Sequence, residues 1–170
     1  MERETALAEF DRSRDAFLDA LRPAPDESLG YLREGDIYAI GGLAVHCNWV
    51  LRHYRRVLDG LASGGGAELR SSDPAGEQDE ANRRALAGLT AEQRALELDE
   101  LNTLHEEVRQ AALGIAPDAW ERKTPVLYGD AADAYLTSPD DVVGWLRDHY
   151  REHVPHATEL LAEWQSTRDR

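Results

Sequence analysis

Apolar residues recur at helical spacing along four long segments of this chain. In residues 3–21, for example, Leu7, Phe10, Phe17 and Leu18 fall on one stripe. A sustained repeat of about 3.6 residues predicts an amphipathic α-helix, whereas alternation of apolar and polar residues predicts a strand. The sequence contains neither sustained alternation nor an internal repeat, so we expect an all-α protein.

Start and stop signals bound the second and third segments. The second begins near Asp36, a residue type that caps helices, and ends at glycines 64–66. The third covers residues 79–113. Because the sequence TAEQ at residues 90–93 has the spacing of a capping box, we expect a break in this segment near Gly88.

The last segment carries the strongest helix start signal of the chain. Ser138 suits the N-cap, Pro139 suits the first helical position, and two aspartates follow in the first turn. The apolar stripe of this segment includes Trp145 and continues to about Trp164. We therefore predict a helix that starts after Ser138 and ends near Trp164.

Four long helices predict an antiparallel four-helix bundle, folded as a single domain over residues 1–170. Residues 63–78 are polar and rich in turn formers, so we expect a loop there. Residues 114–137 form a long connection before the last helix. A connection this long in a compact domain is usually either functional or wrongly assigned as a loop. If it is functional, we expect it to form the wall or lid of a site.

The net charge of −14 narrows the range of partners. Acidic residues outnumber basic ones by 33 to 19, and no basic stripe is present of the kind that nucleic-acid binding requires. We therefore predict no nucleic acid and no membrane surface as a partner, and favour a small molecule or a protein. The charged N-terminus is unlike a secretory signal, and the single Cys47 permits no internal disulfide, so we predict a cytoplasmic protein.

Three of the six histidines lie in the stretch HYREHVPH, residues 149–156. Residues four apart on a helix project from one face, so His149 and His153 can hold one metal ion between them. His149 and His156 are about 10.5 Å apart along a helix axis, which is too far for a shared ion. His153 and His156 form a rival pair.

A third ligand is expected from another helix, and His46 is the best candidate because it lies on or beside the inner face of the second segment. Cys47 is turned about 100° away from it, which favours a small buried apolar role. His53 shares the face of His46 but lies two turns away, too far to join the same ion. His105 also faces inward on the third segment. For each histidine alone, the alternative of a hydrogen-bonded core residue remains open.

Pro155 lies between these histidines in the last segment. Within a helix, proline removes a backbone hydrogen bond and crowds the carbonyl four residues earlier, which favours a kink. We hypothesise that such a bend re-aims the pair His149 and His153.

The sequences AVHCNW and WLRDHYREHVPHA resemble the DinB-like family of metal-binding four-helix bundles, together with the related YfiT-like and mycothiol-dependent isomerase-type proteins. The resemblance covers most of the chain in helix order and length. It implies His46, His149 and His153 as metal ligands. This chain departs from the family where relatives often carry a further His or Gln, since Val154 and Pro155 stand there.

The resemblance also implies what the site does. It implies a divalent transition metal, zinc first and nickel or iron as alternatives, with an open coordination position. It further implies a low-molecular-weight thiol as a cofactor, an S-transferase, isomerase or hydrolase acting on a small molecule, and a homodimer. Asp148 and Glu152 flank the ligands in sequence and could orient an imidazole.

Two other hypotheses stay open. The spelling H-x-x-E-H at residues 149–153 is that of one class of zinc peptidases, in which Glu152 would act as general base. Alternatively, the chain is a non-catalytic, stress-associated metal-binding or scaffold protein whose ion only stabilises the bundle.

Overall fold

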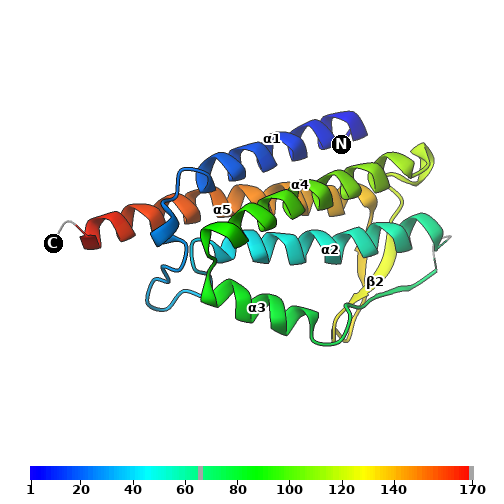
Figure 1. Cartoon of the computed structure of the whole chain (residues 1–170). Helices are drawn as coiled ribbons and strands as arrows, with labels where there is room; N and C mark the ends of the chain where they lie inside the picture. The colour runs from blue at the N-terminus through cyan, green and yellow to red at the C-terminus, as the bar shows by residue number, and fades with distance from the viewer. Residues whose placement is uncertain (65–66, 169–170) are drawn as a thin grey trace.

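The computed structural model describes residues 1–64 and 67–168 and is a bundle of long helices (Figure 1). The helices are α1 (Arg3–Leu21), α2 (Gly42–Ser63), α3 (Glu77–Ala87), α4 (Ala91–Gly114) and α5 (Pro139–Arg168). Two short 3-10 helices, η1 (Asp26–Ser28) and η2 (Pro117–Ala119), and three strands, β1 (Leu69–Ser71), β2 (Thr124–Tyr128) and β3 (Tyr135–Thr137), complete the described chain. The predicted fold class is confirmed, because α1, α2, α4 and α5 form a four-helix bundle.

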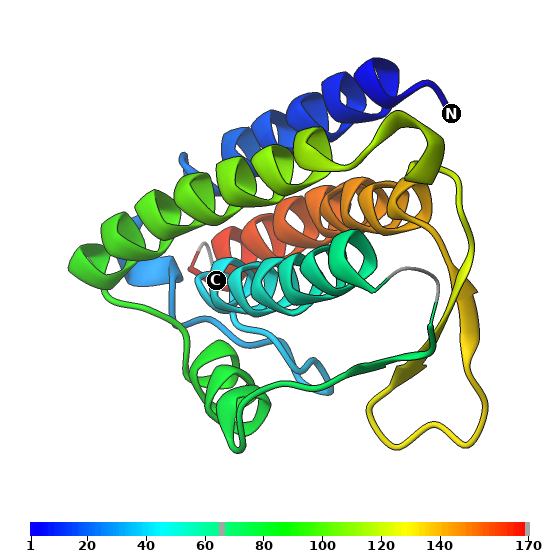
Figure 2. The ribbon, with the colours of Figure 1, turned by 90° about the vertical axis from the view of Figure 1, so that its right-hand side faces the viewer.

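Two helices of the bundle run in each direction (Figures 1 and 2). α1 and α5 are parallel neighbours, and the amino group of Met1 lies 2.8 Å from Asp140 where both helices begin. α2 and α4 are also parallel neighbours, and the amide of Asn48 donates to the carboxylate of Glu97 at 2.9 Å. α2 packs antiparallel against α5, which brings the early part of α2 to the middle of α5.

Because α2 and α4 are parallel, the chain has to return along the bundle between them. β1 and α3 lie on this return path, and α3 packs against α2. The predicted break near Gly88 is confirmed, since α3 ends one residue before it and Gly88 has a left-handed φ of 75°. The predicted capping box is also confirmed, with the Gln93 N–H donating to the Thr90 hydroxyl at 3.2 Å.

The predicted start of the second helix at Asp36 is wrong, because α2 begins at Gly42. The backbone N–H groups of residues 39–41 donate to carbonyls outside the helix, one of them to Ala85 of α3 at 2.9 Å. A Cβ on Gly42 would lie 1.8 Å from that same Ala85 oxygen. Gly42 therefore lets α2 approach the backbone of α3, and the helix begins at this contact.

The predicted start of the last helix is confirmed. Pro139 is its first residue, the Asp141 N–H donates to the Ser138 hydroxyl at 3.2 Å, and the Ser138 N–H donates to the Asp141 carboxylate at 2.7 Å. α5 continues through Pro155 as one helix and ends at Arg168, beyond the predicted end at Trp164. Proline therefore does not terminate this helix.

A small sheet packs beside the bundle, where no strands had been expected (Figure 2). Its order is β1-β2-β3, with β1 parallel to β2 and β2 antiparallel to β3. β1 lies in the predicted loop 63–78, and β2 and β3 lie in the connection 114–137. Strands of three to five residues are too short to show alternation in the sequence.

The core lies between the four long helices and includes the fully buried Phe10, Phe17, Leu43 and Leu101. Burial of such side chains supplies most of the stabilisation of a helical bundle. Within the described residues, none of the helices combines the length and the apolar character that crossing a membrane demands.

Candidate metal centre

His46 of α2 and His149 and His153 of α5 converge at one point in the bundle. One nitrogen of each ring lies within 4.8 Å of one nitrogen of each of the others. The ring centroids are 4.9 Å apart for His46 and His149, 5.3 Å for His46 and His153, and 4.6 Å for His149 and His153. We call these three residues the histidine cluster. The residues predicted as ligands are therefore brought together.

One local feature of the sequence and one feature of the helix packing produce this convergence. His149 and His153 are one turn apart on α5, so both rings leave the same face of that helix. His46 is in the second turn of α2, and the antiparallel packing of α2 on α5 places this turn opposite the histidine pair. The Gly42 contact with α3 fixes where α2 begins, so it also fixes the position of His46.

The rings of the cluster are mostly buried and lack protein hydrogen-bond partners. Nε2 of His149 and both ring nitrogens of His153 are buried without a partner among the described residues. A buried polar atom without a partner costs about 1–3 kcal/mol, so these nitrogens are suited to coordinate a bound ion.

Burial also keeps these imidazoles neutral. It lowers the pKa of His46 to about 3, that of His149 to about 4 and that of His153 to about 3, with the neighbouring histidines as a further cause for His46 and His153. A neutral imidazole has a free lone pair on one nitrogen, which is the form that binds a metal.

Aromatic rings hold the cluster in place. Tyr38, in the irregular segment before α2, stacks on His46 with ring centroids 4.3 Å apart, and its ring is nearly perpendicular to that of His153, with centroids 5.8 Å apart. Trp49 lies one turn after His46 on α2, at 6.2 Å. The sequence does not reveal the role of Tyr38, because it predicts a helix over residues 36–41 and Tyr38 lies in an irregular segment instead.

His156 lies next to the cluster without belonging to it. Its ring stacks on His153 at 5.7 Å, and its Nε2 lies 2.9 Å from the carboxylate of Asp36. Arg33 donates to the same carboxylate at 3.0 Å. The residue predicted to cap α2 is thus part of a polar contact between the α1–α2 connection and α5.

The other candidate residues lie outside the cluster. Cys47 is buried in the core, and burial raises the pKa of its thiol. His53 contacts Asp73 and Ser71 instead. His105 is fully buried, stacks on Phe10 at 3.9 Å and lies 2.9 Å from Asp11 through Nε2, so it is a hydrogen-bonded core histidine.

The two acidic neighbours of the ligands do not orient them. Asp148 accepts hydrogen bonds from Arg147 at 2.8 and 2.9 Å, and Glu152 is exposed. No carboxylate belongs to the histidine cluster in the parts of the chain described. The peptidase hypothesis needs Glu152 at the ion and a further acidic ligand, so the geometry argues against it.

Trp145, expected on the inner face, is 39% exposed.

Comparison with known proteins identifies the family and the fold of the chain. The family model described as the DinB superfamily matches residues 9–157. The chain belongs to the DinB superfamily. Among solved structures, it is similar to YfiT from Bacillus subtilis, described as a probable metal-dependent hydrolase with an unusual four-helix bundle topology. The TM-score is 0.73 at 15% identity, over 96% of this chain and 88% of the other, which shows a shared fold. None of the curated proteins matches the chain.

The DinB bundle of this chain therefore presents three neutral imidazoles from two helices at one point. Imidazole suits zinc, and also nickel and iron. The unpartnered nitrogens of His149 and His153 fit such an ion, because coordination would satisfy one nitrogen on each ring.

Proposed function

We propose that this protein is a metal-dependent enzyme that acts on a small molecule, with His46, His149 and His153 as the ligands of one divalent transition ion. The observation that carries the proposal is the convergence of three mostly buried imidazoles without a carboxylate among the described residues. Three protein ligands are typical of catalytic zinc sites, which keep a position open, whereas structural sites have four.

An ion held in this way supplies Lewis acidity, which lowers the pKa of a water or thiol bound at the open position. The residues around the histidine cluster hold the imidazole rings in position. Tyr38 limits rotation of the His46 ring by stacking on it. The apolar surroundings of the cluster keep the imidazoles neutral, so that protons do not compete with the ion near neutral pH.

Hydrolysis is the reaction class that we favour, and zinc is the metal. The structural similarity is to a protein described as a probable metal-dependent hydrolase. A thiol-dependent transferase or isomerase would use the same open position, with a low-molecular-weight thiol in place of water. Cys47 cannot supply this thiol itself, because it is 1% exposed and lies outside the cluster.

Metal analysis of the purified protein tests the ligand assignment. We expect about one equivalent of zinc, nickel or iron in the wild type and a strong loss of metal in His46→Ala. His53→Ala is the matched control, because it removes a histidine from the same helix outside the cluster. Equal metal content in wild type and His46→Ala would refute the proposal.

Cobalt substitution tests the open position. The visible spectrum of Co²⁺ responds to its ligands, so a small thiol that binds the ion should produce a sulfur-to-metal charge-transfer band, and an exchangeable water should make the spectrum depend on pH. A spectrum that responds to neither would favour the non-catalytic hypothesis, in which the ion only stabilises the bundle.

A further inference from the structure

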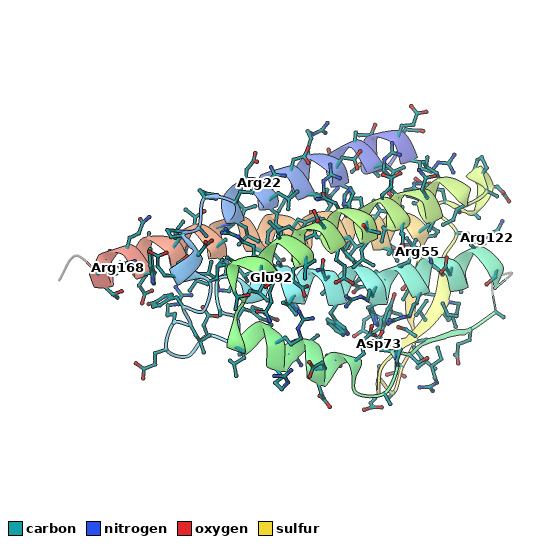
Figure 3. The ribbon with its side chains drawn as sticks, viewed as in Figure 1. Arg22, Arg55, Asp73, Glu92, Arg122 and Arg168 are labelled. Carbon is teal, nitrogen blue, oxygen red and sulfur yellow. The ribbon has the colours of Figure 1, made fainter. Side chains whose placement is uncertain are left out.

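A second group of polar side chains surrounds His53, seven residues after His46 on α2. Its Nδ1 lies 3.0 Å from both carboxylate oxygens of Asp73, and its Nε2 lies 3.2 Å from the hydroxyl of Ser71. Ser71 is the last residue of β1, and Asp73 is in the segment that leads to α3. Figure 3 shows Asp73 close to α2 and β2.

These contacts define the hydrogen positions when the ring is neutral. An ionised carboxylate can only accept, so Nδ1 of His53 carries the hydrogen and donates it to Asp73. Nε2 then has the free lone pair and accepts the hydrogen bond of the Ser71 hydroxyl. A serine, a base within hydrogen-bond reach and a carboxylate that orients the base are the parts of an activated serine nucleophile.

The three residues open onto a pocket of about 570 Å³. Trp49 contributes an aromatic surface to its wall, and Arg70 contributes a cation. Pockets of roughly 300–1,000 Å³ that combine apolar surface with a few polar groups are typical of small-molecule sites. Ser71 is 8% exposed, so it is largely screened from bulk water, and it lines the pocket.

A contact from α2 fixes the carboxylate. Arg56, three residues after His53, donates to Asp73 and to Glu77 at the start of α3. The guanidinium therefore holds the carboxylate that orients the imidazole, and it ties the segment after β1 to α2. Such support is what a nucleophile site needs in order to keep its geometry.

We propose that Ser71, His53 and Asp73 form a second, metal-independent site that hydrolyses small carboxylic esters. The Ser71 oxygen attacks the ester carbonyl carbon while its proton passes to Nε2 of His53. The bond from that carbon to the alkoxy oxygen then breaks, and the departing alcohol takes the proton from His53. Water, deprotonated by His53, attacks the carbonyl carbon of the acyl-serine. The bond from this carbon to the Ser71 oxygen then breaks, His53 returns the proton to that oxygen, and the carboxylic acid leaves. No oxidant, reductant or further reactant is needed.

Covalent labelling tests the nucleophile directly. The full-length protein is incubated with a fluorophosphonate probe, and intact-mass and peptide mass spectrometry locate the adduct. We expect one adduct on Ser71, and none in Ser71→Ala. Ser72→Ala is the matched control, because it removes the neighbouring hydroxyl, which is not bonded to His53 among the described residues. A wild-type protein that is not labelled at Ser71 would overturn the proposal.

Hydrolysis of p-nitrophenyl acetate tests the activity. We expect His53→Ala and Asp73→Asn to lower kcat/KM by about 10²–10⁴-fold, the usual contribution of an oriented base. The melting temperature of each variant is measured alongside. If His53→Gln and Ser71→Ala change the melting temperature but not the rate, the three residues serve only to fix β1 on α2, and the proposal is wrong.

The same assay separates this site from the metal centre. Chelation and His46→Ala should remove the metal and leave the Ser71-dependent ester hydrolysis unchanged. Ester hydrolysis that disappears with the metal would overturn the second site while supporting the first. Metal content that is insensitive to His46→Ala would refute the first site and leave the second standing.

Discussion

Replacing Gly42 by alanine tests the contact that positions the metal centre. The new Cβ would lie 1.8 Å from the carbonyl oxygen of Ala85 and 2.6 Å from its carbonyl carbon. Both atoms belong to the backbone of α3, so no side-chain rotation can relieve the overlap. Either α2 or α3 has to move.

The cost of this overlap can be estimated. Insertion of an extra carbon into a packed interior typically costs about 1–3 kcal/mol, and a clash with backbone atoms belongs at the upper end. A loss of about 3 kcal/mol in the free energy of unfolding lowers the melting temperature of a protein of this size by about 6–12 °C. Because His46 is one turn after Gly42, the affinity for metal should fall as well.

Gly144→Ala is the matched control. Gly144 lies inside α5, and a Cβ there would meet nothing within 4 Å. Alanine is favoured over glycine in a helix by about 0.5–1 kcal/mol, so this variant should melt about 1–4 °C above the wild type. Thermal denaturation and a metal titration with a chromophoric chelator compare the two variants. If Gly42→Ala melts at the wild-type temperature and binds metal normally, the close approach of α2 to α3 is not what fixes His46.

Three further predictions concern stability. Thr90→Ala removes the capping hydroxyl of α4 and should lower the free energy of unfolding by about 1 kcal/mol, as measured by urea denaturation. Leu146→Ala opens a cavity at a residue that is 2% exposed in the core, so a loss of about 2–5 kcal/mol is expected in the same assay. The metal-free protein should lose stability as the pH falls below about 6.5, because the unfolded chain takes up protons there while burial holds the pKa of each histidine in the cluster at about 3 to 4 in the fold. A urea midpoint that is equal at about pH 7 and about pH 5 would contradict this last expectation.

The helices that could be predicted are those whose ends are set by local chemistry. The start of α5 depends on Ser138, Pro139 and Asp141, which lie within four residues of sequence. Ser138 and Asp141 hydrogen-bond to each other, and Pro139 is the first residue of the helix. The Thr90 capping box is local in the same way. Such ends follow from the identities of a few neighbouring residues, so the sequence is sufficient to locate them.

The start of α2 could not be predicted, because a distant segment determines it. The N–H of Ala39 pairs with Ala85, which is 46 residues away in sequence, and Gly42 packs on the same carbonyl. Asp36 is of a residue type that often caps helices, yet its carboxylate contacts His156 of α5. The sheet was missed for a similar reason, since Leu69 of β1 pairs with Val126 of β2 and neither strand is long enough to show a period.

The candidate metal ligands could be predicted because their spacing has a local part. His149 and His153 share a face by helix geometry alone, His46 was the best third candidate because it lies on or beside the inner face of its segment, and the resemblance to the DinB-like family implies the same three residues. The group around His53 lacked any such signal. Ser71 and Asp73 lie in a segment whose composition predicted a loop, and only the packing of β1 beside α2 brings them to the ring.

One face of α2 connects the two proposed sites. His46, Trp49 and His53 lie three and four residues apart, so their rings follow one another along this face, with centroid separations of 6.2 and 5.8 Å. Trp49 therefore contacts both histidines and forms part of the pocket beside Ser71. A change that shifts α2 along its axis would move both sites together, whereas His46→Ala and Ser71→Ala each remove one site and leave the helix in place. Gly42→Ala should thus impair metal binding and ester hydrolysis in parallel, which neither single-site variant can do.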